Sequence, residues 1–182
     1  MDPGVVVPLL LALLLAGAVY LFVRRATRAL QTTRQIARFQ HDASQLGTRL
    51  DGVLGLLTER VDRLRRREIP AEELQPHVDS ALQELGAGIE EARAIEAPPF
   101  LEESRRGLVE EIERAMRAAE MVLHACELMT GPQSRERGPE AQTAVKRGYL
   151  NLLHVREALA EHVANLAEAR DPAARKWRTS RT

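Results

Sequence analysis

The chain has 182 residues, and its 26 basic and 26 acidic side chains give a net charge of zero. A single cysteine excludes a disulfide scaffold, and the balanced charge excludes a uniformly basic nucleic-acid binder. Aromatic residues make up only 3% of the chain, whereas Leu, Ala, Glu and Arg are abundant, so the composition predicts helix throughout.

The first element is an uncharged segment over residues 5–23, VVVPLLLALLLAGAVYLFV. As a helix it would rise about 28 Å, close to the ~30 Å hydrocarbon core of a bilayer. Its front is acidic and its end lacks the small-x-small pattern of a cleaved signal peptide. We therefore predict a retained transmembrane helix that follows a short extracytoplasmic N-terminus, residues 1–4.

A basic block follows this segment directly, because no acidic residue occurs between Arg24 and Asp42. The positive-inside rule then places the C-terminal part in the cytoplasm, on a juxtamembrane stalk helix over residues 24–40. The unpaired Cys126 fits a reducing compartment. Arg greatly outnumbers Lys, which is typical of GC-rich bacterial genomes, so the predicted location is the bacterial inner membrane.

Four helical stretches are predicted beyond this point, over residues 26–68, 71–95, 100–130 and 140–170. Apolar residues recur along each at steps of three and four, which keeps them on one face. Short connections that contain proline make consecutive helices antiparallel neighbours. The predicted fold is therefore all-α, a coiled-coil-like up-down four-helix bundle over residues 41–170 with a long first helix.

One stretch of the first helix carries a family resemblance. Residues 41–57, HDASQLGTRLDGVLGLL, begin with His and an acid and continue to a Gly and a run of Leu. In this they resemble the phospho-accepting helix of histidine-kinase dimerisation hairpins. The resemblance implies that His41 accepts phosphate, that Asp42 is its general base, and that the helix pairs into a dimeric four-helix bundle.

A layer of glycines is predicted in the middle of the bundle. When the helices are registered about their connections, Gly52, Gly86, Gly88 and Gly107 fall at one level around His162. Glycine costs about 1 kcal/mol per helix position relative to Ala, so such a cluster needs a reason. Either the helices approach closely there, or the missing side chains leave a cavity with the imidazole on its wall.

The last segment, residues 171–182, is basic and is predicted to be disordered. The fourth helix of an up-down bundle ends on the membrane side, within reach of the anionic inner leaflet. Trp is a residue type that settles at the headgroup level. The predicted membrane-surface contacts are Arg24, Arg25, Arg28, Arg175, Lys176, Trp177 and Arg178.

The common catalytic and metal-binding motifs, such as a Walker loop, HExxH, GxSxG and CxxC, do not occur. We therefore predict no enzyme activity, no cofactor, no metal, no nucleic-acid partner and no small-molecule substrate. The predicted function is that of a single-pass membrane protein presenting a cytoplasmic helical bundle for protein–protein interaction or self-association. The alternatives are a signalling component that accepts phosphate on His41 and a small-molecule sensor that uses the glycine layer.

Overall fold

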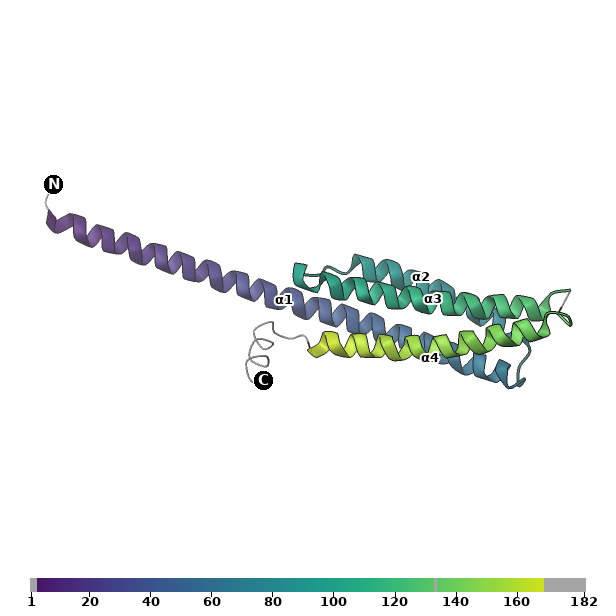
Figure 1. The fold of residues 1–182 in the computed structure, drawn as a ribbon. Helices are drawn as coiled ribbons and strands as arrows, with labels where there is room; N and C mark the ends of the chain where they lie inside the picture. The colour runs from purple at the N-terminus through teal and green to yellow at the C-terminus, as the bar shows by residue number, and fades with distance from the viewer. Residues whose placement is uncertain (1–2, 133, 169–182) are drawn as a thin grey trace, which may run out of the picture.

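The computed structural model describes residues 3–132 and 134–168, with side chains over residues 32–132 and 134–166. Four long helices account for most of this part of the chain, and it contains no strand, so the predicted all-helical fold with four helices is confirmed. The elements are α1 (Pro3–Arg65), α2 (Ala71–Ala94), the short 3₁₀ turn η1 (Pro99–Leu101), α3 (Glu102–Thr130) and α4 (Gly138–Glu168) (Figure 1).

The helices form an antiparallel bundle in which each helix packs on its neighbours in sequence, and α4 returns to pack on α1. The α1–α2 and α3–α4 connections lie together at one end, which is termed the distal end (Figure 1). The α2–α3 connection and the last turn of α4 lie at the opposite end, where α1 continues past the other helices. The distal end is therefore the end farthest from the N-terminus.

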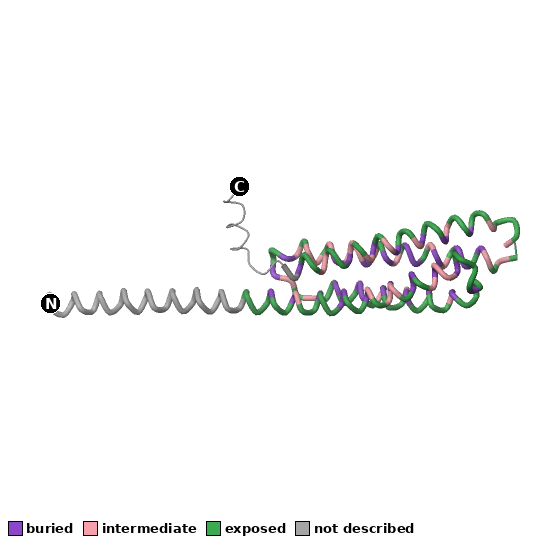
Figure 2. Tube along the Cα trace, turned by 90° about the horizontal axis from the view of Figure 1, so that it is seen from below, coloured by how far each residue is buried: buried purple, intermediate pink, exposed green. Residues whose placement is uncertain are grey.

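The core is a continuous set of apolar side chains along the centre of the bundle, and Figure 2 shows buried residues recurring along every helix. Truncating one such buried leucine to Ala typically costs about 2–5 kcal/mol, so these contacts dominate the stability of the fold. The largest fully buried side chains include Phe39, Leu46, Leu50, Leu54, Leu74, Leu85, Leu108, Ile112, Leu152 and Leu159.

Packing along α1 begins earlier than the sequence predicts. Ile36 and Phe39 are only 8% and 0% exposed, although both fall in the segment predicted as a stalk, residues 24–40. The amide Nε2 of Gln40 donates a hydrogen bond to the carbonyl oxygen of Leu166 at 2.7 Å. The last turn of α4 therefore reaches this part of α1 and covers it.

The ends of the helices differ from prediction by a few residues. η1 precedes α3 because the backbone N–H of Leu101 donates to the carbonyl oxygen of Pro98 at 2.8 Å. α4 begins at Gly138 rather than at residue 140. Pro139 is compatible with this start, since the first helical turn needs no N–H donor.

The predicted membrane segment, residues 5–23, lies within α1 but outside the residues whose side chains are described. In the part of the chain with described side chains, no helix has the length and apolar character needed to cross a membrane. The predicted tail, residues 171–182, and the predicted membrane-surface contacts also lie outside that part.

Candidate functional site

Two glycines of the predicted layer, Gly88 and Gly107, lie directly against side chains of facing helices and leave no cavity there. A Cβ added to Gly107 would lie 2.7 Å from Cε1 of His162, and one added to Gly88 would lie 3.0 Å from Cδ1 of Leu50. The ring of His162 is half-buried, and its Nε2 donates to the carbonyl oxygen of Ser104 at 2.8 Å. Side chains of the facing helices therefore fill the space that these two glycines leave.

The other two glycines of the predicted layer make no such contact. No atom lies within 4 Å of a Cβ added to Gly52 or Gly86, so both face open space. Registration fixes the height of a residue along the bundle but not the direction in which its helix face points. The tightest contacts of an added Cβ occur at Gly47, against Val163, and at Gly148, against Val122. Gly148 follows the spacing of the apolar residues of its helix.

His41 and Asp42 lie on the exposed face of α1. Nε2 of the His41 ring is 3.0 Å from the side-chain amide nitrogen of Gln45. Asp42 lines a pocket of about 740 Å³ between α1 and the α2–α3 connection. Solvent therefore reaches the imidazole, and phosphate acceptance by His41 stays a prediction.

The one cysteine is unsuited to nucleophilic chemistry. Cys126 is fully buried, and burial, with a smaller effect of nearby acids, raises the pKa of its thiol to about 11. The thiol is therefore protonated at neutral pH, and the thiolate is the reactive form. Nowhere among the described residues do three His, Cys, Asp or Glu side chains gather to hold a metal ion.

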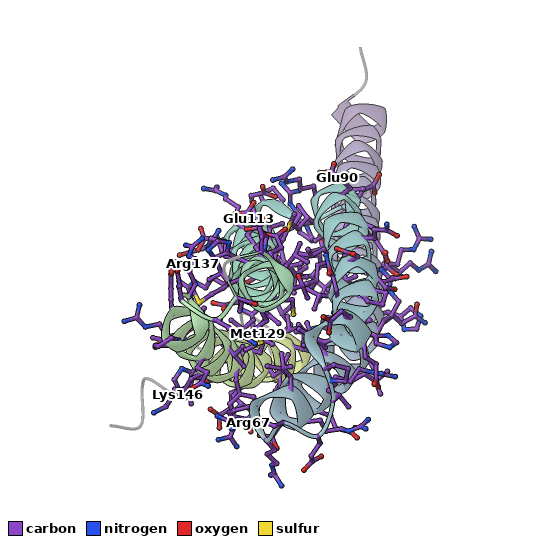
Figure 3. All side chains as sticks on the ribbon, turned by 90° about the vertical axis from the view of Figure 1, so that its right-hand side faces the viewer. Arg67, Glu90, Glu113, Met129, Arg137 and Lys146 are labelled. Carbon is purple, nitrogen blue, oxygen red and sulfur yellow. The ribbon has the colours of Figure 1, made fainter. Side chains whose placement is uncertain are left out.

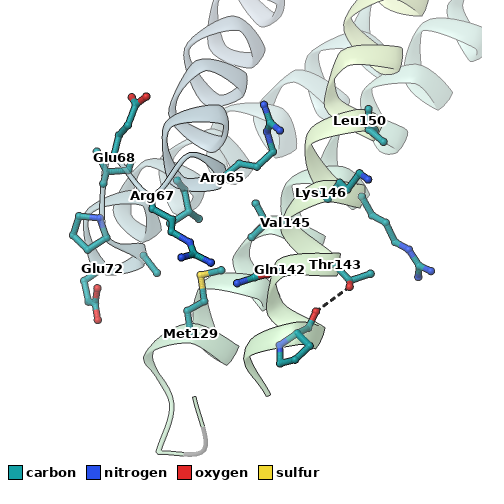
Figure 4. A pocket seen from close by; sticks show the side chains of 16 residues that line it. Arg65, Arg67, Glu68, Glu72, Met129, Gln142, Thr143, Val145, Lys146 and Leu150 are labelled. Atoms are coloured by element: carbon teal, nitrogen blue, oxygen red, sulfur yellow. Dashed lines mark hydrogen bonds between the residues drawn. The ribbon is translucent and has the colours of Figure 1, made fainter. Parts of the chain in front are cut away.

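A pocket that the sequence did not predict lies at the distal end (Figure 4). Its volume is about 1140 Å³, and it lies between the α1–α2 turn with the start of α2 and the facing ends of α3 and α4. Part of its lining is buried core, and one apolar residue at its edge, Leu150, is 43% exposed. The apolar lining residues include Leu64, Ile69, Ala71, Met129, Val145 and Leu150.

Basic side chains outnumber acidic ones around this pocket. Arg65, Arg67, Lys146 and Arg147 line it, against the two acids Glu68 and Glu72. Arg67, Lys146 and Arg147 are exposed, and none of them takes part in a salt bridge with another described residue. Three positive charges are therefore available to a ligand at this end of the bundle, and Figure 3 shows two of them, Arg67 and Lys146.

Arg65, the fourth basic residue, is already engaged. Its Nη2 lies 2.7 Å from Oδ1 of Asp62, and its guanidinium carbon lies 5.2 Å from the centre of the Tyr149 ring. The hydrogen bond between Arg65 and Asp62 lowers the pKa of the Asp62 carboxyl and raises that of the guanidinium. Both groups therefore stay charged, and Arg65 joins the end of α1 to α4 rather than pointing freely outward.

Arg67 reaches the pocket through an unusual backbone conformation. Its φ is 63°, the one positive φ of a non-glycine residue in the described chain. The N–H groups of Glu68 and Arg67 donate to the carbonyl oxygens of Arg63 and Leu64, each at 2.9 Å, as in a Schellman motif. This motif ends α1 at Arg65, three residues before the predicted end.

The left-handed position of a Schellman motif usually holds Gly, because a side chain there costs about 1–2 kcal/mol. In this chain it holds Arg67, whose guanidinium points across the pocket towards Met129 (Figure 4). A sequence signal for this feature existed only in the run of arginines before Ile69-Pro70. That run could not reveal which arginine would adopt the left-handed conformation.

No protein-family model matches the chain, and no curated protein or solved structure shows significant similarity to it. Its function must therefore be argued from the chemistry of its surface rather than from its fold. The distal pocket combines an apolar lining with three basic side chains that form no ion pair with another described residue.

Proposed function

We propose that the chain is a single-pass membrane protein whose N-terminal segment anchors a cytoplasmic helical bundle, and that the bundle binds a protein partner at its distal end. The uncharged residues 5–23 and the arginine block that follows them support the anchor and its orientation. The observation that carries the binding function is the distal pocket, apolar inside and basic at its rim. The proposed role is binding, without catalysis.

The position of the pocket suits a partner that approaches from the cytoplasm. α1 is continuous over 63 residues, so Arg65 lies about 60 Å along the helix from residue 23. The pocket lies at the distal end of the bundle, opposite the end at which α1 extends towards the N-terminus (Figure 1). A protein bound there would therefore stay clear of the proposed bilayer surface.

The character of the pocket favours a protein partner over a small molecule. Small-molecule sites usually enclose most of their ligand's surface, whereas this pocket opens at the end of the bundle with Leu150 at its edge. The alternative sensor function needed a cavity in the glycine layer, where His162 and Leu50 fill the space.

Site-specific photo-crosslinking in membranes tests the proposal. A photoreactive amino acid at Leu150 probes the distal pocket, and the same amino acid at Leu56, exposed on the side of α1, is the matched control. We expect one discrete adduct with another protein from position 150 and none from position 56. No adduct at position 150, or the same adducts from both positions, would contradict the proposal.

A second candidate function is phosphate acceptance by His41, and the exposure of its ring on α1 is the observation that favours it. The resemblance to histidine-kinase dimerisation helices implies that Asp42 would act as the general base. Incubation with acetyl phosphate should then give an acid-labile phosphate on the wild type and on His124→Gln, but not on His41→Gln. Equal labelling of the two variants would contradict this function.

A further inference from the structure

We propose that the distal pocket binds a short acidic segment of its partner, in which an apolar side chain is flanked by Asp or Glu. The inference rests on the proposed function and specifies the chemistry of the partner. The apolar side chain would pack on the lining around Met129, and the carboxylates would pair with Arg67, Lys146 and Arg147.

The charge of the bundle reverses locally at the distal pocket. Residues 42–169 contain 24 acids and 16 bases, a net charge of −8, whereas the pocket is lined by four bases and two acids. A broad acidic surface, such as an anionic bilayer, would meet repulsion from the rest of the bundle. A short acidic segment touches only the basic site, so the charge pattern selects a peptide rather than a large anionic surface.

The unpaired basic side chains of the pocket come from two parts of the chain. Arg67 comes from the α1–α2 turn and Lys146 from α4, and Val145 lies between them (Figure 4), while Arg147, next to Lys146, also lines the pocket. Cations therefore stand on two sides of an apolar centre. A guanidinium binds carboxylate through two parallel hydrogen bonds, and the flexible thioether of Met adapts to different apolar side chains.

Arg67 has a strained backbone conformation. Its backbone occupies a region that favours glycine, although the turn itself needs no side chain to form. Strained residues persist where the surrounding structure holds them, and they cluster at binding sites. In this chain the strained residue is also the one whose unpaired charge points into the pocket (Figure 4).

The test measures binding and stability on the same variants of the full chain in nanodiscs of neutral lipid. The probe is a fluorescein-labelled twelve-residue peptide in which Leu alternates with pairs of Glu. Two reference peptides replace every Glu by Lys or every Leu by Ser. Fluorescence anisotropy should show salt-sensitive binding of the Glu/Leu peptide and much weaker binding of both references.

Arg67→Gly is the decisive variant. It should raise the melting temperature, because Gly suits the left-handed conformation. It should also weaken binding of the Glu/Leu peptide about tenfold, because it removes a positive charge from the pocket. Arg66→Ala is the matched control, since Arg66 is a neighbouring exposed arginine that pairs with Asp62 and does not line the pocket. It should leave the affinity within about twofold of the wild type. Arg67→Lys should recover part of the affinity, because it keeps the positive charge.

Several outcomes would overturn the proposal. They are equal affinity of Arg67→Gly and wild type for the Glu/Leu peptide, equal binding of the Lys/Leu peptide, or a crosslink at Leu150 to a second copy of this chain. If the peptide fails to bind while Leu150 still crosslinks to another protein, the acidic-segment inference is wrong and the proposed function stands. If both experiments fail, the proposed function fails with it.

Discussion

Adding a side chain at a helical glycine should change stability in opposite directions, depending on the face of the helix that the glycine occupies. A Cβ on Gly148 would lie 2.6 Å from Cγ2 of Val122, which is fully buried and β-branched. A β-branched side chain in a helix has essentially one χ1 rotamer, so it cannot turn away. A Cβ on Gly52 meets no atom within 4 Å.

We therefore predict that Gly148→Ala destabilises the protein by about 1–3 kcal/mol, because the packed neighbour must shift. Gly52→Ala should stabilise it by up to about 1 kcal/mol, because Ala has the higher helix propensity and meets no obstacle. Chemical denaturation of the two variants measures both effects. A shift of the same sign in both would contradict the packing described at these positions.

Three surface carboxyls, one exposed and two half-buried, contribute stability that depends on pH. Hydrogen bonds from Arg65, Arg105 and Arg137 lower the pKa of Asp62, Glu102 and Glu140 respectively. A carboxyl whose pKa is lower in the folded state stabilises the fold above its unfolded pKa and loses that contribution as the pH falls through the folded value. The affected window therefore lies below the ordinary values of 3.8 for Asp and 4.5 for Glu.

The variant Asp62→Asn/Glu102→Gln/Glu140→Gln should consequently lose less stability than the wild type between about pH 5 and about pH 2. The difference should be small, because exposed pairs of this kind contribute little each. Thermal melts over this range measure it. Identical pH profiles for the two proteins would show that these ion pairs do not persist in solution.

At the scale of the elements, each helix is held by one apolar face. Leu108 on α3 is fully buried, whereas Glu110, two residues further on, is exposed. We expect Leu108→Asp to unfold the bundle, since an unpaired buried carboxylate costs several kcal/mol. Glu110→Ala should change the free energy of unfolding by less than about 0.5 kcal/mol.

Circular dichroism of a fragment covering residues 32–168 measures both variants. The fragment starts before Ile36, where the buried side chains of α1 begin. A helical, cooperatively melting Leu108→Asp fragment would contradict the assignment of this face to the core.

Pairs of residues far apart in sequence fix how the elements sit against one another. Nε of Arg156 donates to Oδ1 of Asp51 at 2.9 Å, which joins α4 to α1. Gly55 lies beside this arginine, and a Cβ added to it would be in ordinary van der Waals contact, 3.4 Å from Nη2 of the guanidinium. The pair is partly exposed, so its main effect is on the register of the two helices rather than on stability.

At the scale of the whole molecule, the testable property is orientation. The proposed anchor, residues 5–23, is followed by an arginine block, so we predict that the bundle lies in the cytoplasm. Two reporters fused after Thr182 test this orientation. A reporter that works only in the cytoplasm should be active there, and a reporter that works only in the periplasm should be silent. The opposite pair of results would place the distal pocket outside the cytoplasm and remove the proposed partner.

The sequence by itself determined the four helices and the face that each turns to the core. Leu50, Leu54 and Leu57 recur along α1 at steps of four and three, and all are buried. These properties follow from local periodicity, because any helix with such spacing has one apolar face to bury. The exposure of His41 likewise followed from its place off that face.

Only the tertiary structure decided which residues of different helices meet. The distal pocket joins the α1–α2 turn to α3 and α4, and the Asp51–Arg156 pair spans 105 positions. Of the predicted glycine layer, Gly88 and Gly107 face neighbouring helices while Gly52 and Gly86 face open space. The physical reason is that spacing along one helix fixes its apolar face, whereas contacts between helices depend on the rotation and register that packing of all four selects.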